Sequence, residues 1–286
     1  MILVTGAAGK TGIALIKALT AKGAKVRGLV RRQEQAAEME ALGATAAIGT
    51  FDNAQTLAVA ARDIEAIYHI CPNASRDEVR FARNVAAAAK LNAVNRFVFH
   101  SVLHPQIQRM PHHWAKLRAE EILLTAGFDL TILQPAAYMQ NILGVWRSIA
   151  DHGIFRVPYP AETRLSLVDL DDVAEAGAHV LLTDGHAGAT YELVGTAPLS
   201  QTEVAEALSV TLSNPIRVAP ETAEDWRTRA MANGMPAYEC DTLVAMFRYY
   251  AQFGLAGNAN TLRWLLGREP TTLPQFLRRV TTKSAA

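Results

Sequence analysis

Short apolar runs alternate with amphipathic helical patterns through the first half of the chain, and this rhythm constrains the fold more than any other feature. Strand, helix and strand in succession form right-handed crossover units, which build a parallel sheet covered on both faces. This alternation of strand and helix patterns becomes irregular after about residue 135, and from residue 221 onward the pattern is mostly helical. Strands are expected at residues 2–5, 25–30, 46–49, 66–70, 96–100, 130–133 and 190–195.

The segment TGAAGKTG, residues 5–12, joins the first expected strand to the first helix and can be interpreted in two ways. A P-loop needs G-x-x-x-x-G-K-[ST], but its first glycine would fall on Val4. A dinucleotide-binding turn needs glycines with the spacing of Gly6, Gly9 and Gly12, for a tight turn, approach to a pyrophosphate and close helix packing. The dinucleotide interpretation is favoured, and the loop residues expected at the cofactor are Gly6, Ala8, Gly9, Lys10, Thr11 and Gly12.

The end of the second expected strand indicates which dinucleotide binds. NAD sites place an acidic residue there for the ribose 2′-hydroxyl, whereas this chain has Arg31 and Arg32 and no carboxylate before Glu34. A guanidinium suits a 2′-phosphate through charge-assisted, often bidentate hydrogen bonds. The pair therefore predicts NADP(H), and the alternative is that both arginines are solvated surface charges.

Composition and length set the remaining limits. The chain has 286 residues, of which 19% are charged, and its formal net charge of +1 provides no basic field for nucleic acid. Its two distant cysteines favour a reducing compartment. No apolar run is long enough to span a membrane, and the first residues do not resemble a signal peptide. These features predict a cytoplasmic protein and leave a homodimer open.

The expected fold class is therefore α/β, with a doubly wound parallel sheet of the Rossmann type and a smaller, mostly helical C-terminal lobe. We expect the cofactor-binding domain at residues 1–150, with its sheet completed by parts of 165–195, and the substrate-binding lobe at 151–286.

Several segments together resemble the NmrA-like group of atypical short-chain dehydrogenase/reductases. The segments are VTGAAGKTG (4–12), VRGLVRR (26–32), GTFDN (49–53), RFVFHSV (96–102), HHWAKLRAEEIL (112–123), TILQPAAYMQNI (131–142) and VDLDDVAEAGAHVL (168–181). The likeness covers about residues 1–195 and is looser beyond them, although RWLLGREPTTLPQFL (263–277) resembles how such chains end. It implies a Rossmann domain with a small substrate lobe. Members include NADP(H)-dependent reductases of quinones, dyes and related compounds, and NADP-binding redox sensors.

The resemblance also implies where individual residues lie. Phe51 and Asp52 would flank the adenine, and His69, Ile70 and Cys71 would line the cofactor at the end of the fourth strand.

The nicotinamide side is implied in the same way. Ser101 would sit beside the nicotinamide, and Lys116 matches the lysine of a Y-x-x-x-K motif that binds the nicotinamide ribose. The tyrosine position holds His112, which puts ordinary alcohol dehydrogenase chemistry in doubt. His112 could act as a general acid, but it could equally be a surface residue at a helix start. The helix face that carries Lys116 is expected to be open to the cleft.

Other side chains are candidates for the substrate cleft. Pro135 is expected to lie at the cofactor and turn the chain into the cleft, and the C-terminal lobe is rich in aromatic residues and methionine. The candidates for the substrate pocket are Tyr138, Met139, Asn141, Trp226 and Tyr238. An apolar, aromatic pocket of this kind suits a flat hydrophobic substrate.

Plainer interpretations are preferred at three further places. The histidines lack metal-ligand spacing, so no metal site is expected. Asp169, Asp171 and Asp172 are interpreted as caps at the start of a helix over 172–182. Cys71 is interpreted as a core thiol, because no basic neighbour in sequence would lower its pKa.

Together these features predict an NADP(H)-dependent oxidoreductase that transfers hydride to an apolar, aromatic or conjugated small molecule, such as a quinone, azo or enone compound. Such acceptors need less help from a side-chain acid than a simple ketone does, which agrees with the missing tyrosine. The alternative is a non-catalytic NADP(H)-binding redox sensor. An isomerase or epimerase would ordinarily need the tyrosine.

Overall fold

A computed structural model describes residues 1–284, which form two compact units. Unit 1 comprises Met1–Gln106, His113–Gln134 and Val173–Tyr191, and unit 2 comprises Ile107–His112, Pro135–Asp172 and the chain from Glu192 onward. The two units alternate along the sequence, and the functional division expected at residue 150 stays a prediction.

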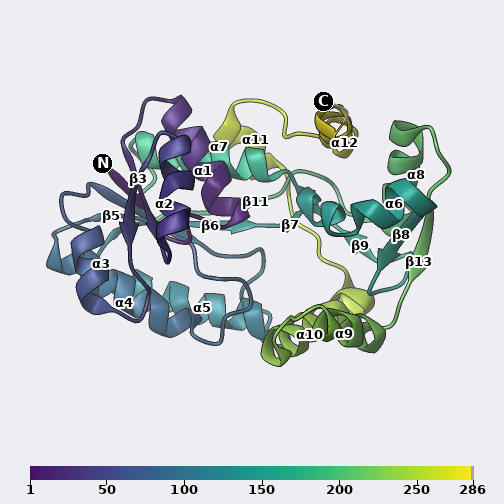
Figure 1. Ribbon diagram of the computed structural model, residues 1–286, viewed down its shortest axis with the longest axis horizontal. Coiled ribbons are helices and arrows are strands. Elements are labelled where there is room, and N and C mark those ends of the chain that lie inside the picture. The colour runs from purple at the N-terminus through teal and green to yellow at the C-terminus, as the bar shows by residue number, and fades with distance from the viewer. Residues whose placement is uncertain (285–286) are drawn as a thin grey trace. The chain divides into compact units, whose positions relative to one another are not determined.

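Within residues 1–284, seven strands form one large sheet in the order β11-β6-β5-β4-β1-β2-β3 (Figure 1). These strands are β1 (Ile2–Val4), β2 (Val26–Val30), β3 (Thr45–Ile48), β4 (Ala66–His69), β5 (Arg96–His100), β6 (Asp129–Pro135) and β11 (Thr190–Leu193). The pairings of β1 with β2 and β4, of β2 with β3, and of β5 with β4 and β6 are parallel. All strands expected for this sheet are present, and the predicted fold class is confirmed.

The strand order places a topological switch point beside β1. The chain runs from β1 to β2 and β3 on one side and then crosses to β4, β5 and β6 on the other. Doubly wound sheets bind their ligands at the carboxyl edge where the order reverses in this way. The glycine loop follows β1 directly, so the sheet topology places it at this edge.

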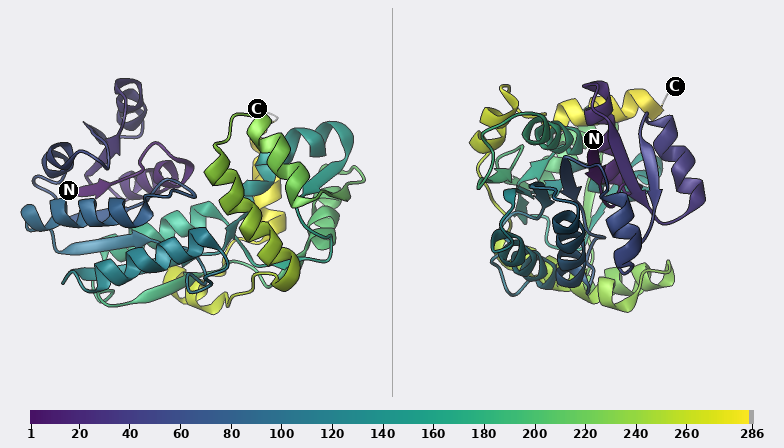
Figure 2. Two further views of the ribbon diagram at one scale, coloured as in Figure 1. Left: turned by 90° about the horizontal axis from the view of Figure 1, so that it is seen from below. Right: turned by 90° about the vertical axis from the view of Figure 1, so that its left-hand side faces the viewer.

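Helices cover both faces of the sheet in unit 1. They are α1 (Lys10–Ala21), α2 (Gln33–Ala41), α3 (Ala54–Ala60), α4 (Glu78–Leu91), α5 (Pro111–Leu124) and α7 (Leu170–Leu182). Figure 1 shows α3, α4 and α5 on one face and α1, α2 and α7 on the other, and the left view of Figure 2 looks onto α4 and α5. The core between the sheet and α3–α5 includes Ile67, Val85, Phe97, Phe99 and Leu123, all buried. This core fixes the helices that carry the site.

Unit 2 contains short strand pairs and most of the C-terminal helices. Its strands are β7 (Ala137–Tyr138), β8 (Ile154–Val157), β9 (Arg164–Leu165), β10 (Leu167–Val168), β12 (Leu199–Ser200) and β13 (Arg217–Pro220). Its helices are η1 (Met139–Val145), α6 (Trp146–His152), α8 (Gln201–Leu212), α9 (Ala223–Ala232), α10 (Ala237–Phe253), α11 (Asn260–Leu266) and α12 (Leu273–Ser284). Ser200 and Glu203 form a capping box at the start of α8, because each side chain accepts a hydrogen bond from the other residue's backbone N–H.

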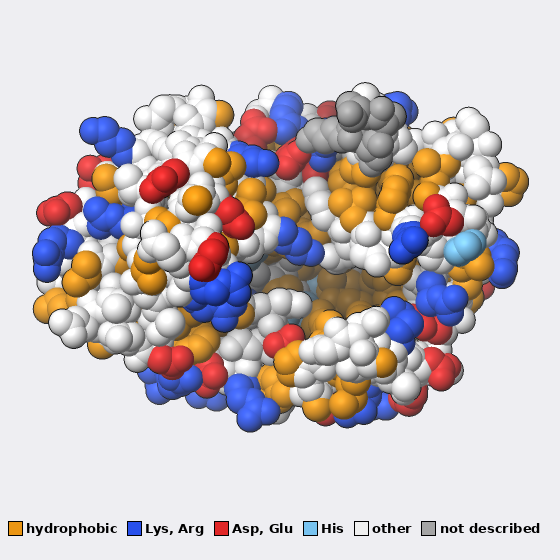
Figure 3. Space-filling view, in the orientation of Figure 1, with side chains coloured by type: hydrophobic (Ala, Val, Ile, Leu, Met, Phe, Trp, Pro, Cys, Tyr) orange, Lys and Arg blue, Asp and Glu red, His pale blue; other side chains and the backbone are white. Residues whose placement is uncertain are grey.

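The surface is mixed in charge. On the face shown in Figure 3, basic and acidic side chains are interspersed with apolar ones. In residues 1–284 there is no helix with both the length and the apolar character needed to cross a bilayer.

Candidate functional site

Backbone geometry determines the shape of the loop between β1 and α1. Gly6 has a φ of +62°, and the Gly9 N–H donates to the Gly6 carbonyl at 3.0 Å, which closes a tight turn. A Cβ on Gly12 would lie 2.5 Å from the Gly6 oxygen and 2.6 Å from the Ala7 oxygen. The geometry therefore requires glycine at position 6 for the turn and at position 12 for the close approach of helix and strand.

The start of α1 fits an anionic ligand. Gly9 precedes the helix without a side-chain cap, and the first turn carries no acidic residue. The first N–H groups of a helix have no partner within it, and the helix dipole adds partial positive charge there. Ala8, Gly9, Lys10 and Thr11 are all at least partly exposed, so these groups lie open to a ligand. The loop and helix start match what the pyrophosphate of a dinucleotide requires.

Arg31 and Arg32 follow β2 at the same edge of the sheet. The Gln35 Oε1 atom accepts from their backbone N–H groups at 3.0 and 3.2 Å, which fixes the backbone here. Both side chains are exposed, and the Arg32 Nε atom lies 3.8 Å from the Glu34 carboxylate. The backbone is thus held while both guanidinium groups remain accessible to a phosphate.

Phe51 and Asp52 follow β3 and are already engaged. The Phe51 ring stacks on Phe81 at a centroid distance of 4.9 Å, and Asp52 forms an ion pair with Arg80. Arg80 also contacts Asp77 at 3.0 Å. Asp52 is therefore neutralised by a neighbour, and its predicted place beside an adenine stays a prediction.

His69, Ile70 and Cys71 are buried where β4 ends. The His69 Nδ1 atom is hydrogen-bonded to Thr5 Oγ1 at 2.8 Å. Burial, followed by the Lys116 charge, lowers the pKa of His69 to about 3, so the ring is neutral. Burial also raises the pKa of Cys71, with the neighbouring Glu78 acting in the same direction. Cys71 is thus a protonated thiol, as the core interpretation expects.

Lys116 is buried, contrary to the expectation of an open helix face. It is 3% exposed, and its Nζ atom lies 3.0 Å from Oε1 of the fully buried Glu78. The ammonium also donates to the His100 carbonyl at 2.8 Å. Burial, followed by the Lys116 charge, lowers the pKa of His100 to about 3. Lys116 can be buried because Glu78 supplies the partner that an ammonium in an apolar surrounding requires.

A second buried carboxylate lies on the same helix, one turn after Lys116. Ser101 Oγ donates to Glu120 Oε1, and Gln134 Nε2 donates to the same oxygen at 2.9 Å. The Ser101 N–H donates to the Leu133 carbonyl at 2.8 Å, which anchors the residue between β5 and β6. Burial raises the pKa of Glu120, although both hydrogen bonds and Lys116 act to lower it. We call Glu78, His100, Ser101, Lys116, Glu120 and Gln134 the buried polar cluster.

Neither Glu120 nor Gln134 is predicted from the sequence, although signals for both exist. Gln134 is a polar residue in the otherwise apolar strand LTILQP, and buried amides need partners. Glu120 lies four residues after Lys116, which places both side chains on one helix face.

The remaining predicted residues lie in unit 2. His112 is the second residue of α5 and is partly buried, and Pro135 ends β6. Tyr138 is partly buried, Asn141 is exposed and Met139 is fully buried. On the C-terminal helices, Trp226 packs edge-on against Phe247 at 4.8 Å, and Tyr238 is 36% exposed. Their role in a substrate pocket stays a prediction.

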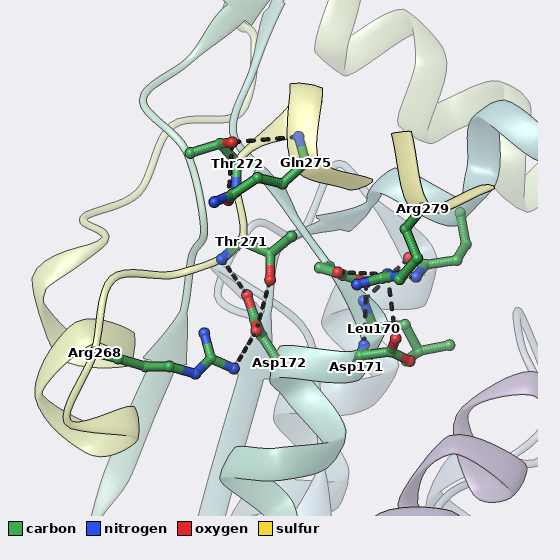
Figure 4. A network of polar contacts seen from close by, with 10 residues as sticks. Leu170, Asp171, Asp172, Arg268, Thr271, Thr272, Gln275 and Arg279 are labelled. Atoms are coloured by element: carbon green, nitrogen blue, oxygen red, sulfur yellow. Dashed lines mark hydrogen bonds and ion pairs between the residues drawn. The ribbon is translucent and has the colours of Figure 1, made fainter. Parts of the chain in front are cut away.

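The aspartates at the start of α7 are structural. Asp169 accepts from Gln140 Nε2 at 2.7 Å, from the Asp171 N–H at 3.2 Å and from Arg279 at 2.6 and 2.9 Å. Asp172 accepts from the Thr271 N–H at 2.6 Å and from Arg268 at 2.7 Å (Figure 4). α7 begins at Leu170, slightly earlier than expected. Asp169 therefore caps α7, whereas Asp172 holds the segment before α12 in place.

The sheet, its switch point and the glycine loop define a Rossmann-type α/β protein. The family model described as "NmrA-like family" matches residues 1–281, and the chain belongs to this family.

Individual relatives extend over nearly the same length. The chain is 28% identical over 278 residues to the NAD(P)H azoreductase of Xenophilus azovorans, with 96% of each chain covered. It is 25% identical over 277 residues to quinone oxidoreductase 2 of Escherichia coli (strain K12), again with 96% of each covered. The solved structure of the E. coli NADPH-dependent quinone oxidoreductase complexed with NADPH has a TM-score of 0.87 at 24% identity, covering 98% of this chain and 100% of that chain.

Proposed function

We propose that the protein is an NADPH-dependent reductase of conjugated or aromatic small molecules. The observation that carries the proposal is the pairing of the glycine loop and uncapped start of α1 with the exposed Arg31 and Arg32 at the next strand end. The first part suits a pyrophosphate and the second a 2′-phosphate. The relatives named as an NAD(P)H azoreductase and a quinone oxidoreductase support both the cofactor and the acceptor class.

Bound NADPH would supply a hydride, and the residues of this chain would bind, orient and protect the reactants. The loop residues would hold the pyrophosphate, Arg31 the 2′-phosphate, and Phe51 and Asp52 the adenine side. Ser101 would lie on the nicotinamide side. Lys116 uses two of its three N–H donors on Glu78 and the His100 carbonyl, and the third would donate to a ribose hydroxyl once the buried ammonium is reached by the cofactor.

The acceptor side is proposed for unit 2. Tyr138, Asn141, Trp226 and Tyr238 each retain exposed surface that an apolar acceptor could cover. Met139 is fully buried and would have to move to reach an acceptor. We also propose a cytoplasmic location, since both cysteines are free thiols and suit a reducing compartment.

The test is to follow NADPH absorbance with purified protein against a panel of quinones, azo dyes and enones. We expect acceptor-dependent oxidation with at least one class, and slower oxidation in Arg31→Ala at subsaturating NADPH. A redox sensor would give a different result: no acceptor would raise oxidation above background, yet NADP⁺ and NADPH would bind with different affinities. That result would overturn the reductase proposal.

A further inference from the structure

The missing tyrosine leaves a reductase without its usual proton donor, and the buried polar cluster contains a replacement. Ser101 follows β5 directly, at the carboxyl edge that also carries the glycine loop. Its hydroxyl is hydrogen-bonded to a buried carboxyl group, Glu120, which is held from the other side by Gln134. A hydroxyl alone is a poor acid, but a hydroxyl that is hydrogen-bonded to a carboxylic acid can donate its proton and receive the proton of that acid in the same step.

We propose that Ser101 delivers the proton of the reduction and that Glu120 resupplies it. This inference rests on the proposed reductase function and names the proton source of that same site. Ser101 is the catalytic residue, because it would touch the acceptor. It is 3% exposed, so the side chains around it would have to move before the acceptor reaches its hydroxyl. Glu120 acts through Ser101, and Gln134 holds Glu120 in place.

The protonation state of Glu120 sets the direction of the Ser101 hydroxyl. A Glu120 carboxylate accepts the Ser101 proton, so the hydroxyl points inward and cannot serve an acceptor. A Glu120 carboxylic acid donates to Ser101 Oγ instead, which frees the Ser101 O–H to donate outward. Only the acid form of Glu120 therefore supports proton delivery.

The step balances in atoms and electrons. The acceptor gains two electrons with the hydride that bound NADPH supplies, and its oxygen or nitrogen gains one proton. The Ser101 O–H bond breaks as the new bond to the acceptor forms, and the Glu120 O–H bond breaks as its proton joins Ser101 Oγ. Glu120 is left as a carboxylate, and water restores its proton.

The surroundings of Glu120 favour its acid form. The cation facing it is Lys116, one turn earlier on α5, but Glu78 from α4 already pairs with that ammonium at 3.0 Å. Ionised Glu120 would add a second negative charge to a buried site that holds one ammonium, and burial is the largest cause of its raised pKa. The other members of the cluster are neutral: Ser101, Gln134 and His100, whose pKa burial lowers to about 3.

The experiment measures kcat against pH, from about pH 5 to about pH 9, with saturating NADPH and a quinone. Because the acid form is active and its pKa is raised above 4.5, wild-type kcat should fall as pH rises through that pKa. Glu120→Gln and Ser101→Ala should each lower the low-pH kcat by at least about tenfold and remove the pH step. The matched control is Glu121→Gln, an exposed neighbour on α5 paired with Arg118, which should keep both the rate and the step.

A second readout needs no turnover. Infrared difference spectra between low and high pH should show the carbonyl band of a buried carboxylic acid titrating at the kinetic pKa. The band should be absent from Glu120→Gln and present in Glu121→Gln. The affinity for NADPH should be the same in wild type, Glu120→Gln and Glu121→Gln, which separates proton delivery from cofactor binding.

Failure of the proposed reductase function and failure of the proton relay alone give different results. If no acceptor oxidises NADPH, the proposed reductase function is overturned and the relay with it. If the enzyme is active but its pH step survives in Glu120→Gln, or the carboxylic acid band persists in that variant, the relay alone is overturned. A structural Glu120 would give this second result, since lost stability does not remove a pH step.

Discussion

Two regions at the carboxyl edge of the large sheet are made in opposite ways. The glycine loop and the Arg31–Arg32 pair are local in sequence, depend on backbone geometry and face solvent. The buried polar cluster is assembled from α4, α5 and the ends of β5 and β6, and depends on side chains removed from water. Exposed cationic side chains need no partner from the rest of the chain, whereas charged side chains removed from water need partners drawn from distant parts of it.

Removal of the ammonium from the buried polar cluster should have the largest effect. Lys116→Met should lower the free energy of unfolding by about 3–5 kcal/mol, because Glu78 is left as an unpaired buried charge. Urea unfolding measures this loss. The exposed Lys17→Met on α1 is the control and should change stability by less than about 0.5 kcal/mol.

A double variant refines the same test. Adding Glu78→Leu to Lys116→Met removes both charges and should recover most of the lost stability. A loss below about 1 kcal/mol in the single variant would mean that the pair is well hydrated in solution.

The glycine loop should respond in affinity. Gly12→Ala places a Cβ 2.5 Å from the Gly6 oxygen, so strand and helix must separate and the pyrophosphate site is lost. We expect NADPH to bind about a hundredfold more weakly, or about 2.7 kcal/mol, by calorimetric or fluorescence titration. Gly144→Ala is the control, since nothing lies within 4 Å of that position. Equal affinities in the two variants would contradict the assignment of the loop.

The arginine pair should set cofactor choice with a smaller effect. NADPH should bind at least about tenfold more tightly than NADH, or about 1.4 kcal/mol, and Arg31→Ala should remove most of this preference. Arg118→Ala, an exposed arginine on α5, should leave it intact. Equal affinity of the unaltered protein for both cofactors would show that the arginines are ordinary surface charges.

The smallest effect is expected at His112. If the acceptor needs little help from this side chain, His112→Ala should lower turnover of a quinone or azo acceptor by less than about tenfold. Steady-state kinetics at saturating NADPH measures it, with His152→Ala as the control. A hundredfold loss with unchanged NADPH affinity would make His112 the acid and contradict the prediction.

The fold was predictable because its signals are local. Most strands of the large sheet are short, largely apolar runs, and Gly6 and Gly12 indicate a turn that requires glycine. The capping box at Ser200 was predictable for the same reason, since its two residues are three apart.

The buried polar cluster was not predictable in this way. The position of Lys116 on α5 follows from sequence, but its burial depends on the packing of α4 against the sheet, which brings Glu78 to it from 38 positions away in a chain of 286 residues. Spacing along α5 relates Glu120 to Lys116, yet nothing local relates it to Ser101 or Gln134. Long-range pairs of this kind are set by tertiary structure alone.

The alternation of the two units along the chain has a consequence for inheritance and engineering. The chain passes from one unit to the other after residues 106, 112, 134, 172 and 191. A single cut or a single recombination junction therefore cannot isolate one intact unit, because each unit comprises three segments interleaved with those of the other. Exchange of one unit between relatives would need a junction at every one of these crossings.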